Sequence, residues 1–239
     1  MTAAEIKFVK SLSQKKFRDS SGLFVVEGEK MVAEALKSRF TVEKVYRREE
    51  IGEAAMARIS ALSSPSPALA LVRRPDDLLR DEVPQKGLIL ALDGIRDPGN
   101  LGTILRIADW FGIDAVFASP DTVDVFNPKV VQATMGAIFR VRFHYTDIPV
   151  FCHRALAAGG KVYGTFLDVE NLYRKALDNG SEAPSVIVIG NEANGISAAT
   201  AARVSERLFI PPFPADDPGS ESLNAAVATA VTVAEFRSR

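Results

Sequence analysis

The sequence LDGIRDPGNLGTILRIADWFG, residues 92–112, carries the most information about the fold. It predicts the end of a buried strand, a glycine-containing turn and then a helix, which is how many nucleotide-binding α/β units begin. One residue is unexpected in this pattern. Arg106 stands one turn into the helix among Ile104, Leu105 and Ile107. A cation on a largely apolar helix has to reach solvent or an anion, because an unpaired buried charge is costly.

Further apolar runs follow this stretch, and helical patterns separate them. The predicted strands are 88–94, 114–119, 161–168, 185–192 and 207–211, and the predicted helices are 100–111, 127–139, 150–159 and 222–239. Continuous apolar strands are typical of a parallel sheet that is covered on both faces. In the last helix the apolar stripe is Leu223, Val227, Ala230, Val231 and Ala234. We therefore expect an α/β fold, a mostly parallel sheet with helices on both faces.

A smaller α/β unit is predicted before this sheet. Its elements alternate as a helix (4–16), a strand (23–28), a helix (29–38), a strand (42–47), a helix (49–62) and a strand (68–74). A charge run with prolines and little apolar periodicity then indicates a linker. The expected division is 1–75 for the small domain, 76–86 for the linker and 87–239 for the large domain.

Composition excludes several classes of protein. The formal net charge is −1, so any attraction to nucleic acid or to a membrane has to come from a local patch. The single cysteine, Cys152, cannot form an internal disulfide, and with His144 and His153 it offers too few ligands for a zinc site. The start of the chain lacks an apolar signal region, and nothing approaches the roughly 18 apolar residues of a spanning helix. We expect a cytoplasmic protein without a metal.

The glycines do not match the common nucleotide-binding motifs. Gly99 and Gly102 lack the third glycine of the dinucleotide fingerprint, and no phosphate-loop lysine pattern is present. Two further polar segments, 190–197 and 210–224, also follow apolar strands. Ligands of open α/β sheets bind beyond the carboxyl ends of the strands. These three polar segments are therefore predicted to meet around one pocket.

Together the three segments resemble the motifs of the SpoU class of SPOUT methyltransferases, the TrmH-like RNA ribose 2'-O-methyltransferases. The matching patterns are Asn100-x-Gly102-x-x-x-Arg106, then Gly190-Asn-Glu-x-x-Gly195, then Ile210-Pro211 with Ser222-Leu223-Asn224. Residues 127–141 are similar to another stretch of that family, and the N-terminal part resembles its small substrate-binding domain. The resemblance implies a C-terminal trefoil knot, S-adenosylmethionine as cofactor, RNA as substrate and a homodimer.

The resemblance also suggests catalytic residues, each of which has a simpler structural interpretation. Arg106 acts on the ribose 2'-hydroxyl in the family, whereas a plain arginine here would reach the surface or pair with Asp109. A guanidinium holds its proton too firmly to be a good base, so binding phosphate and stabilising alkoxide character is the easier role. The other candidates, with the structural alternative for each, are Asn100 (a turn or cap), Glu192 (a first-turn acid), Ser222 (an N-cap) and Asn224, which we place inside the first turn of the last helix.

The cofactor-binding candidates come from the same resemblance. They are Thr165, Leu167, Gly190, Gly195, Ile210 and Leu223, with the backbone at Gly190, Ile210 and Leu223 expected beside the adenosine. The sequence departs from the family between residues 210 and 222, where prolines and two aspartates lengthen the loop. Asp216 and Asp217 are expected to repel RNA phosphate locally.

Basic residues crowd the first 18 positions, with Phe8 and Phe17 among them. Lys7, Lys10, Lys15, Lys16 and Arg18 form a predicted RNA-binding patch, although a solvated helix face would explain the lysines as well. The leading hypothesis is therefore transfer of a methyl group from S-adenosylmethionine to an RNA ribose, in tRNA or rRNA. The alternatives are a knotted RNA-binding or assembly module without activity and, third, a nicotinamide-binding oxidoreductase.

Overall fold

The structure is a computed structural model that describes residues 1–76, 82–167, 171–214 and 222–238. The chain forms two compact units, one of residues 1–76 with 124–140 and one of residues 77–123 with 141–239. The predicted division at residues 75 and 87 thus omits one segment: 124–140 belongs to the first unit although it follows two strands of the second. Aromatic residues of this segment form part of the core of the first unit.

The first unit is built on a three-stranded antiparallel sheet in the order β1-β3-β2. Its elements are α1 (Ala3–Ser11), α2 (Lys15–Ser21), β1 (Leu23–Glu27), α3 (Glu29–Lys37), β2 (Val42–Arg47), α4 (Arg48–Ile51), α5 (Glu53–Ile59) and β3 (Ala68–Arg73). Apolar residues of α1 and α5, such as Ile6 and Met56, pack on Leu69 and Leu71 of β3. This core covers one face of the sheet.

Two predicted helices of this unit are each interrupted. The helix expected over 4–16 ends at Ser11, because Arg18 Nη1 donates to the carbonyls of Leu12 and Ser13 at 2.8 and 2.9 Å and diverts them from helical bonding. The helix expected over 49–62 is divided at Gly52, whose φ of +82° is outside helical geometry. Local apolar periodicity does not reveal either interruption.

Residues 124–140 complete the other face of the small sheet. The segment contains α7 (Pro128–Thr134) and the 3-10 turn η1 (Ala137–Phe139). The ring of Phe126 lies 4.6 Å from that of Phe24 in β1, measured between centroids. The ring of Phe139 lies 5.3 Å from that of Phe40. Burial of these rings joins the segment to the first unit.

The second unit holds a six-stranded sheet in which every pairing is parallel, in the order β6-β5-β4-β8-β7-β9. Its strands are β4 (Gly87–Asp93), β5 (Ala115–Ala118), β6 (Phe143–Tyr145), β7 (Lys161–Thr165), β8 (Pro184–Gly190) and β9 (Glu206–Leu208). The helical elements are α6 (Pro98–Trp110), α8 (Ile148–Ala157), η2 (Leu172–Arg174), α9 (Ala198–Ala201) and α10 (Ala225–Arg237). The expected α/β fold with a mostly parallel sheet is confirmed; β6 was not predicted.

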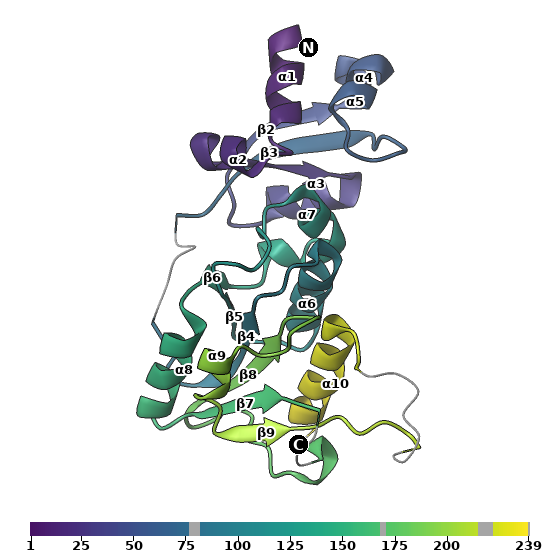
Figure 1. The fold of residues 1–239 in the computed structure, drawn as a ribbon. Helices are drawn as coiled ribbons and strands as arrows, with labels where there is room; N and C mark the ends of the chain where they lie inside the picture. Colours follow the sequence, from purple (N-terminus) through teal and green to yellow (C-terminus); the bar gives the residue numbers. More distant parts are fainter. Residues whose placement is uncertain (77–81, 168–170, 215–221, 239) are drawn as a thin grey trace. The chain divides into compact units, whose positions relative to one another are not determined.

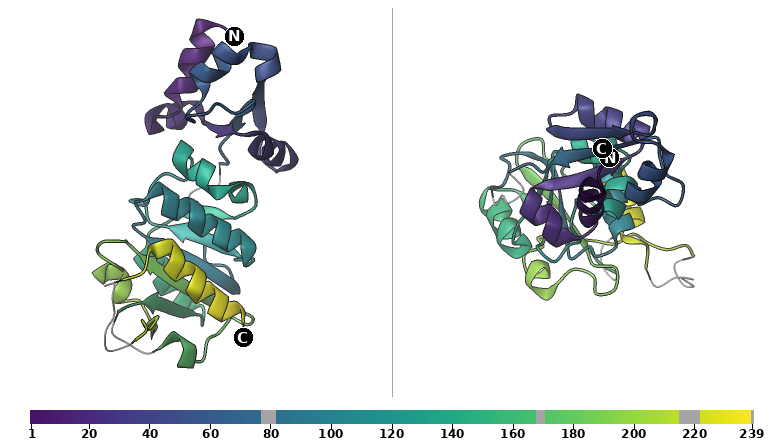
Figure 2. Two further views of the ribbon diagram at one scale, coloured as in Figure 1. Left: turned by 90° about the vertical axis from the view of Figure 1, so that its right-hand side faces the viewer. Right: turned by 90° about the horizontal axis from the view of Figure 1, so that it is seen from above.

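Helices cover both faces of this sheet (Figures 1 and 2). Helices α6 and α10 lie over one face and α8 and α9 over the other. Ile89 and Ala91 of β4 point to the α8 side, where they pack with Phe151 and Cys152. Leu88, Leu90 and Leu92, which alternate with these residues along β4, are fully buried as well. A strand buried on both faces explains the unbroken apolar run in the sequence.

Helix α10 does not bury the stripe that its sequence suggested. Its buried residues are Ala225, Ala226, Thr229, Thr232, Val233 and Phe236. Of the predicted stripe, Leu223 and Val227 are 50% and 49% exposed, and Ala230, Val231 and Ala234 are half-buried. The prediction was wrong because the helix is apolar nearly all round, so periodicity could not choose between its faces.

Candidate active site at the carboxyl edge of the parallel sheet

The parallel arrangement brings distant segments of sequence to one edge of the sheet. β4 and β8 are neighbours, and their register sets Asp93 opposite Gly190. The turn into α6 and the loop after β8 therefore begin side by side. The carboxyl ends of β7 and β9 follow along the same edge, held together because Phe166 N donates to Leu208 O at 2.8 Å.

Three of the predicted catalytic residues form one hydrogen-bonded network. Asn100 Nδ2 donates to Glu192 Oε1 at 2.7 Å, and Asn224 Nδ2 donates to Asn100 Oδ1 at 2.8 Å. Asn100 is buried, and the other two residues are exposed. The network thus joins the starts of α6 and α10 to the loop after β8, which are the three segments whose motifs the sequence singled out.

Helix capping sets the position of each amide in this network. Asp97 is the N-cap of α6 and Oδ1 accepts from Asn100 N at 2.8 Å, with Pro98 in the first helical position. Asn100 therefore lies in the first turn of α6 and is not its cap. Asn224 is the N-cap of α10, and its Oδ1 accepts from Ala226 N and Val227 N at 2.9 and 3.2 Å.

These caps correct two expectations about the last helix. We placed Asn224 inside the first turn and considered Ser222 as the cap. The structure makes Asn224 the cap, while Ser222 is exposed two residues before it. An asparagine serves as well as a serine at this position, and only Asn224 also reaches Asn100. Ser222 does not take part in the network.

The loop that carries Glu192 is a closed turn shaped by its two glycines. Asn191 and Gly195 exchange backbone hydrogen bonds, each 2.9 Å long. A Cβ on Gly190 would lie 2.2 Å from the Gly195 carbonyl carbon, so no other residue fits there. Gly195 has a φ of +67°, which favours glycine. The need for both glycines is thus explained by the turn itself.

Asn191 is a site residue that the sequence reasoning missed. Its Nδ2 donates to Gly94 O at 2.6 Å, and its Oδ1 accepts from Ala193 N and Asn194 N at 2.9 and 3.1 Å. Gly94 N in turn donates to Ser119 Oγ at 2.8 Å. The chain of bonds ties together the ends of β8, β4 and β5. An asparagine between Gly190 and Glu192 was the available signal, since such residues commonly organise turns.

Arg106 is exposed on α6 and makes no side-chain hydrogen bond or ion pair within the described residues. Within the described residues it forms no hydrogen bond or ion pair with Asn100, Glu192 or Asn224. Thr103, Arg106 and Trp110 share one face of α6 by their spacing, and Trp110 is 85% exposed. The guanidinium is thus available to an anion from outside the chain.

The remaining cofactor-binding candidates lie at the same edge. Thr165 ends β7 opposite Leu208 of β9 and is half-buried, and Leu167 follows it with 64% of its surface exposed. Ile210 is half-buried two residues after β9, and Leu223 is exposed before α10. Apolar side chains are therefore accessible to solvent after β7, after β9 and before α10. Asp216 and Asp217, expected to repel phosphate, lie outside the described residues.

The predicted RNA-binding patch lies on α1 and α2 of the first unit and is smaller than expected. Lys7, Lys10, Lys15 and Lys16 are exposed, and Lys16 Nζ lies 4.8 Å from the centroid of the Phe17 ring. Arg18 is only 2% exposed, and its Nε lies 3.0 Å from Asp124 Oδ2. Arg18 is therefore an internal residue that bonds Asp124 and two carbonyls, not part of a surface patch.

The single cysteine is not accessible for chemistry. Burial and the nearby charge of Asp93 raise the pKa of the Cys152 thiol to about 12. No group of three or more metal-ligating side chains occurs within the described residues. Across the same residues, no helix has both the length and the apolar character that a membrane crossing requires.

Two family models match the chain. One, described as the SpoU rRNA Methylase family, covers residues 87–234. The other, the MRM3-like substrate binding domain, covers residues 3–64.

The full length of the chain is similar to characterised proteins and solved structures. The 23S rRNA (guanosine(2553)-2'-O)-methyltransferase RlmP of Bacillus subtilis is 32% identical, with 98% of this chain and 96% of the relative covered. The mitochondrial rRNA methyltransferase 3 of Homo sapiens is 26% identical, with coverage of 94% and 69%. The AdoMet-bound rRNA methyltransferase of Sinorhizobium meliloti superposes with a TM-score of 0.88 at 29% identity, over 100% of this chain and 95% of that one.

Proposed function

Because the chain belongs to the SpoU rRNA methylase family, we propose that it methylates RNA, transferring a methyl group from S-adenosylmethionine to the ribose 2'-hydroxyl of a nucleotide. The substrate is a structured RNA, and the relatives named as rRNA methyltransferases favour rRNA over tRNA. The observation that carries the proposal is the Asn224–Asn100–Glu192 network, which unites the three motif segments at one edge of the sheet. A cytoplasmic location is part of the proposal.

The residues at this edge suit S-adenosylmethionine. The loop after β8 is open beside Gly195, which has no atom within 4 Å of where a Cβ would be, and this space is available to the nucleoside. Thr165, Leu167, Ile210 and Leu223 would surround the adenosine with apolar and backbone groups. When bound, the cofactor supplies a methyl group on a positively charged sulfur. The knot implied by the family resemblance also belongs to this proposal.

Arg106 acts on the RNA. Its guanidinium is free of partners among the described residues and is a permanent cation, so it binds the phosphate beside the target ribose. From there it stabilises negative charge that develops on the 2'-oxygen as the methyl group is transferred. The hydroxyl proton leaves to solvent or to a phosphate oxygen, because a guanidinium does not accept it.

The residues of the Asn100 network hold the site in place and do not take part in the reaction. Asn100 is fixed on both sides, by Glu192 and by Asn224, so the first turn of α6 is held against the loop after β8. Such fixed geometry contributes to catalysis by orienting substrate and cofactor. Ser222, which has no hydrogen bond within the described residues, is available to the substrate.

RNA binding by the first unit rests on the four exposed lysines of α1 and α2. Lys7, Lys10, Lys15 and Lys16 supply phosphate contacts, and the half-exposed rings of Phe8 and Phe17 supply stacking surfaces. Arg18 is left out of this patch because its donors are used inside the unit. The description of the matching family model, a substrate binding domain, supports this role.

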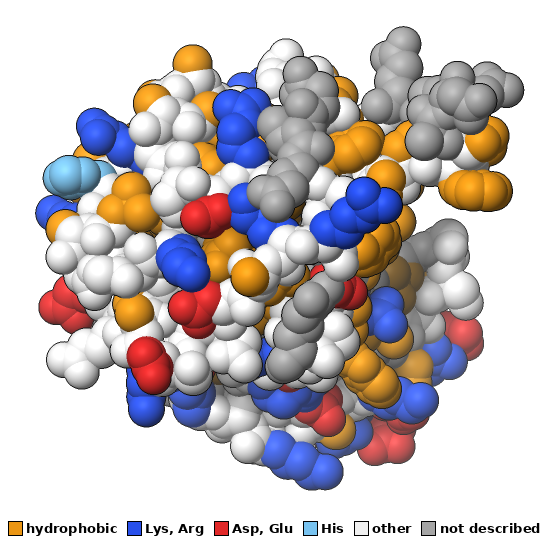
Figure 3. Space-filling view, turned by 90° about the horizontal axis from the view of Figure 1, so that it is seen from below, with side chains coloured by type: hydrophobic (Ala, Val, Ile, Leu, Met, Phe, Trp, Pro, Cys, Tyr) orange, Lys and Arg blue, Asp and Glu red, His pale blue; other side chains and the backbone are white. Residues whose placement is uncertain are grey.

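The protein acts as a homodimer. Large apolar groups remain exposed on α6, on α10 and just before α10, namely Trp110 at 85% and Val227 and Leu223 at about half of their surface. In Figure 3 hydrophobic side chains gather on the right, the side on which α10 lies in Figure 1. Exposed apolar surface of this kind marks an interface between proteins. A second copy of the chain is the proposed partner.

The test combines cofactor binding with RNA mapping. Calorimetry is expected to show binding of S-adenosylmethionine and none of NAD, and mapping of ribose methylation in total RNA is expected to show one mark that depends on this protein. Arg106→Ala should abolish that mark with cofactor affinity nearly unchanged, while Arg58→Ala, an exposed control on α5, should keep it. A map that is identical with and without the protein would instead favour an inactive RNA-binding module.

A further inference from the structure

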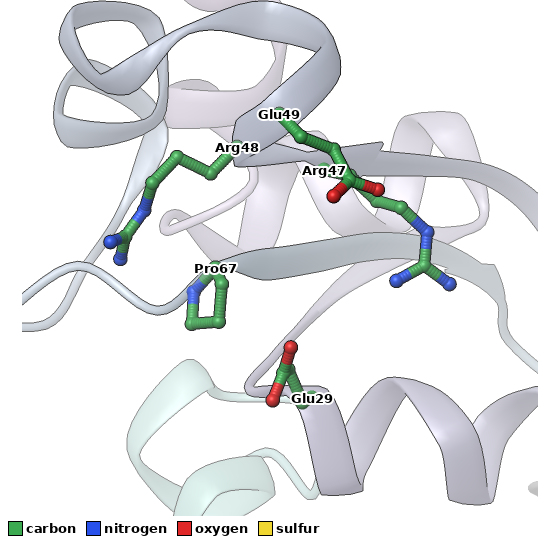
Figure 4. A pocket seen from close by; sticks show the side chains of 5 residues that line it. All are labelled: Glu29, Arg47, Arg48, Glu49 and Pro67. Atoms are coloured by element: carbon green, nitrogen blue, oxygen red, sulfur yellow. The ribbon is translucent and has the colours of Figure 1, made fainter.

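A cavity of about 280 Å³ opens on the first unit (Figure 4). Its lining is Glu29, Arg47, Arg48, Glu49 and Pro67. Three segments build it: the start of α3, the junction of β2 with α4, and the residues just before β3. Figure 4 shows the Glu29 carboxylate rising from α3 towards a gap between Arg48 on one side and Arg47 with Glu49 on the other.

The walls of this cavity are held by hydrogen bonds from behind. Arg48 N donates to Pro67 O at 2.9 Å, and Arg48 Nη2 donates to Pro65 O at 2.6 Å. Glu27, which is 5% exposed, accepts from Ala61 N at 3.0 Å and from the Ser60 hydroxyl. The turn into α3 is thereby anchored to the loop that carries Pro67. The cavity is a built feature of the unit rather than a gap between loose side chains.

The charged groups around the cavity have unused hydrogen-bonding capacity. Within the described residues, Glu29, Arg47 and Glu49 form no ion pair with one another and no side-chain hydrogen bond. Arg48 Nε is buried and has no partner. A buried donor without a partner is costly, and a ligand with acceptor atoms would relieve that cost. The opposed charges therefore remain available to a molecule that offers both donors and acceptors.

The charged side chains that line the cavity determine which kind of ligand it can bind. Two carboxylates would repel a phosphate, and two guanidinium groups would repel a metal ion, so the site suits a neutral polar molecule. The volume is close to the lower limit of about 300 Å³ for small-molecule sites, which is the size class of one planar base. Proline and guanidinium surfaces also suit stacking with an unpaired base.

We propose that this cavity binds one unpaired guanine of the RNA substrate. Guanine presents two adjacent donors, N1–H and the 2-amino group, which match the two oxygens of a carboxylate such as Glu29. It also presents two adjacent acceptors, O6 and N7, which match a guanidinium fork. Adenine, cytosine and uracil lack the paired donors. The cavity adds base recognition to the phosphate contacts of the lysine patch, and this inference rests on the proposed function in RNA.

The test is a saturation-transfer NMR titration of the full-length protein with GMP, AMP, CMP and UMP, in the presence of S-adenosylmethionine. GMP is expected to bind about fivefold or more tightly than the others, as one bidentate base contact provides. Glu29→Gln and Arg47→Gln should each remove this preference. Glu53→Gln and Arg58→Gln are charge-matched controls on exposed positions of α5 and should retain it, as should Arg106→Ala.

Equal binding of all four nucleotides, absence of saturable binding, or equal loss in the control variants would overturn the inference. Thermal unfolding of every variant shows whether a lost preference reflects a lost fold, and Arg47→Lys then provides a second, milder variant. Ribose methylation is measured on the same preparations. Methylation without a guanine preference would reject this inference alone, and a guanine preference without cofactor binding or methylation would reject the proposed function alone.

Discussion

The side-chain amide of Asn224 donates to Asn100 Oδ1 at 2.8 Å, although 124 residues separate the two in the sequence. Asn100 extends the network to a third residue, because its own amide group donates to Glu192 Oε1 at 2.7 Å. Both hydrogen-bonding sides of one buried amide are thus used. This arrangement fixes the start of α6, the helix that also carries Arg106, from two directions.

Replacing Asn100 by aspartate should turn its attractive contact with Glu192 into a repulsive one. The new carboxylate would face Glu192 where a donor now stands, so methyl transfer is expected to fall about tenfold or more through the like-charge repulsion. Lowering the pH should partly restore the rate, since one proton shared by the two carboxylates removes the repulsion. Steady-state rates across pH check this. Asn171→Asp, a cap of η2 where aspartate serves equally, is the matched control.

Asn191→Asp should break the hydrogen bond between the loop after β8 and the turn after β4, while keeping the turn of residues 191–195. The aspartate still accepts from Ala193 N and Asn194 N, but it places an oxygen against Gly94 O. Loss of this bond is expected to lower the free energy of unfolding by about 1–3 kcal/mol and to lower kcat more than it raises KM for RNA. Denaturant unfolding and steady-state kinetics measure both. Wild-type kcat in this variant would contradict the role, and Asn194→Ala, with an exposed side chain, should change neither.

The pair of Arg18 and Asp124 should dominate the stability of the first unit. Arg18→Met leaves Asp124 buried without its cation and is expected to cost about 3–5 kcal/mol. The double variant Arg18→Met with Asp124→Asn should cost clearly less than the sum of the single changes. Urea unfolding followed by a probe in the first unit tests this. Lys15→Ala, which removes only an exposed pair with Asp19, should cost less than about 1 kcal/mol.

Cys152 should resist thiol reagents in the folded protein. Its pKa of about 12 means that almost no thiolate forms near pH 8, and the side chain is fully buried. A thiol whose folded pKa is raised holds its proton after the unfolded thiol has lost it. The free energy of unfolding should therefore decrease as pH rises from about 9 to 12. Alkylation with and without denaturant measures the first effect, and Cys152→Ala should remove the second.

Charge introduced on the exposed apolar surface should disrupt the proposed homodimer. Val227→Glu or Trp110→Glu is expected to shift the protein from dimer to monomer in analytical ultracentrifugation, because a carboxylate would be buried at the interface. Leu36→Glu, at another position with an exposed hydrophobic side chain, should leave the assembly unchanged. A monomeric wild-type protein would refute the proposal directly.

Much of the parallel sheet was predictable because β4, β5, β7 and β8 are apolar on both faces, and polar residues follow each of them. The three-residue strand β6 was missed, since Phe143–Tyr145 is too short for any periodicity. The three polar segments were predicted to meet, and they do so in the network of Asn100, Glu192 and Asn224. Their pairing could not be derived, because it depends on which strands are neighbours.

The failures have a common physical origin in contacts between distant residues. Arg18 looked like a surface cation among lysines until Asp124, far along the chain, provided its partner. The outward apolar stripe of α10 looked like the core side because both faces of the helix are apolar. Asn191 was not predicted as a site residue, because its role depends on the neighbouring position of Gly94 in the folded chain.

The insertion of residues 124–140 into the first unit has a consequence for synthesis. Arg18 and Phe24 leave the ribosome well before Asp124 and Phe126 are made, since 106 positions separate Arg18 from Asp124. The small sheet thus leaves the ribosome with one apolar face uncovered and with the guanidinium of Arg18 still without its carboxylate partner. Its maturation depends on translation passing through two strands of the catalytic sheet, so the two halves of the polypeptide cannot be completed one after the other.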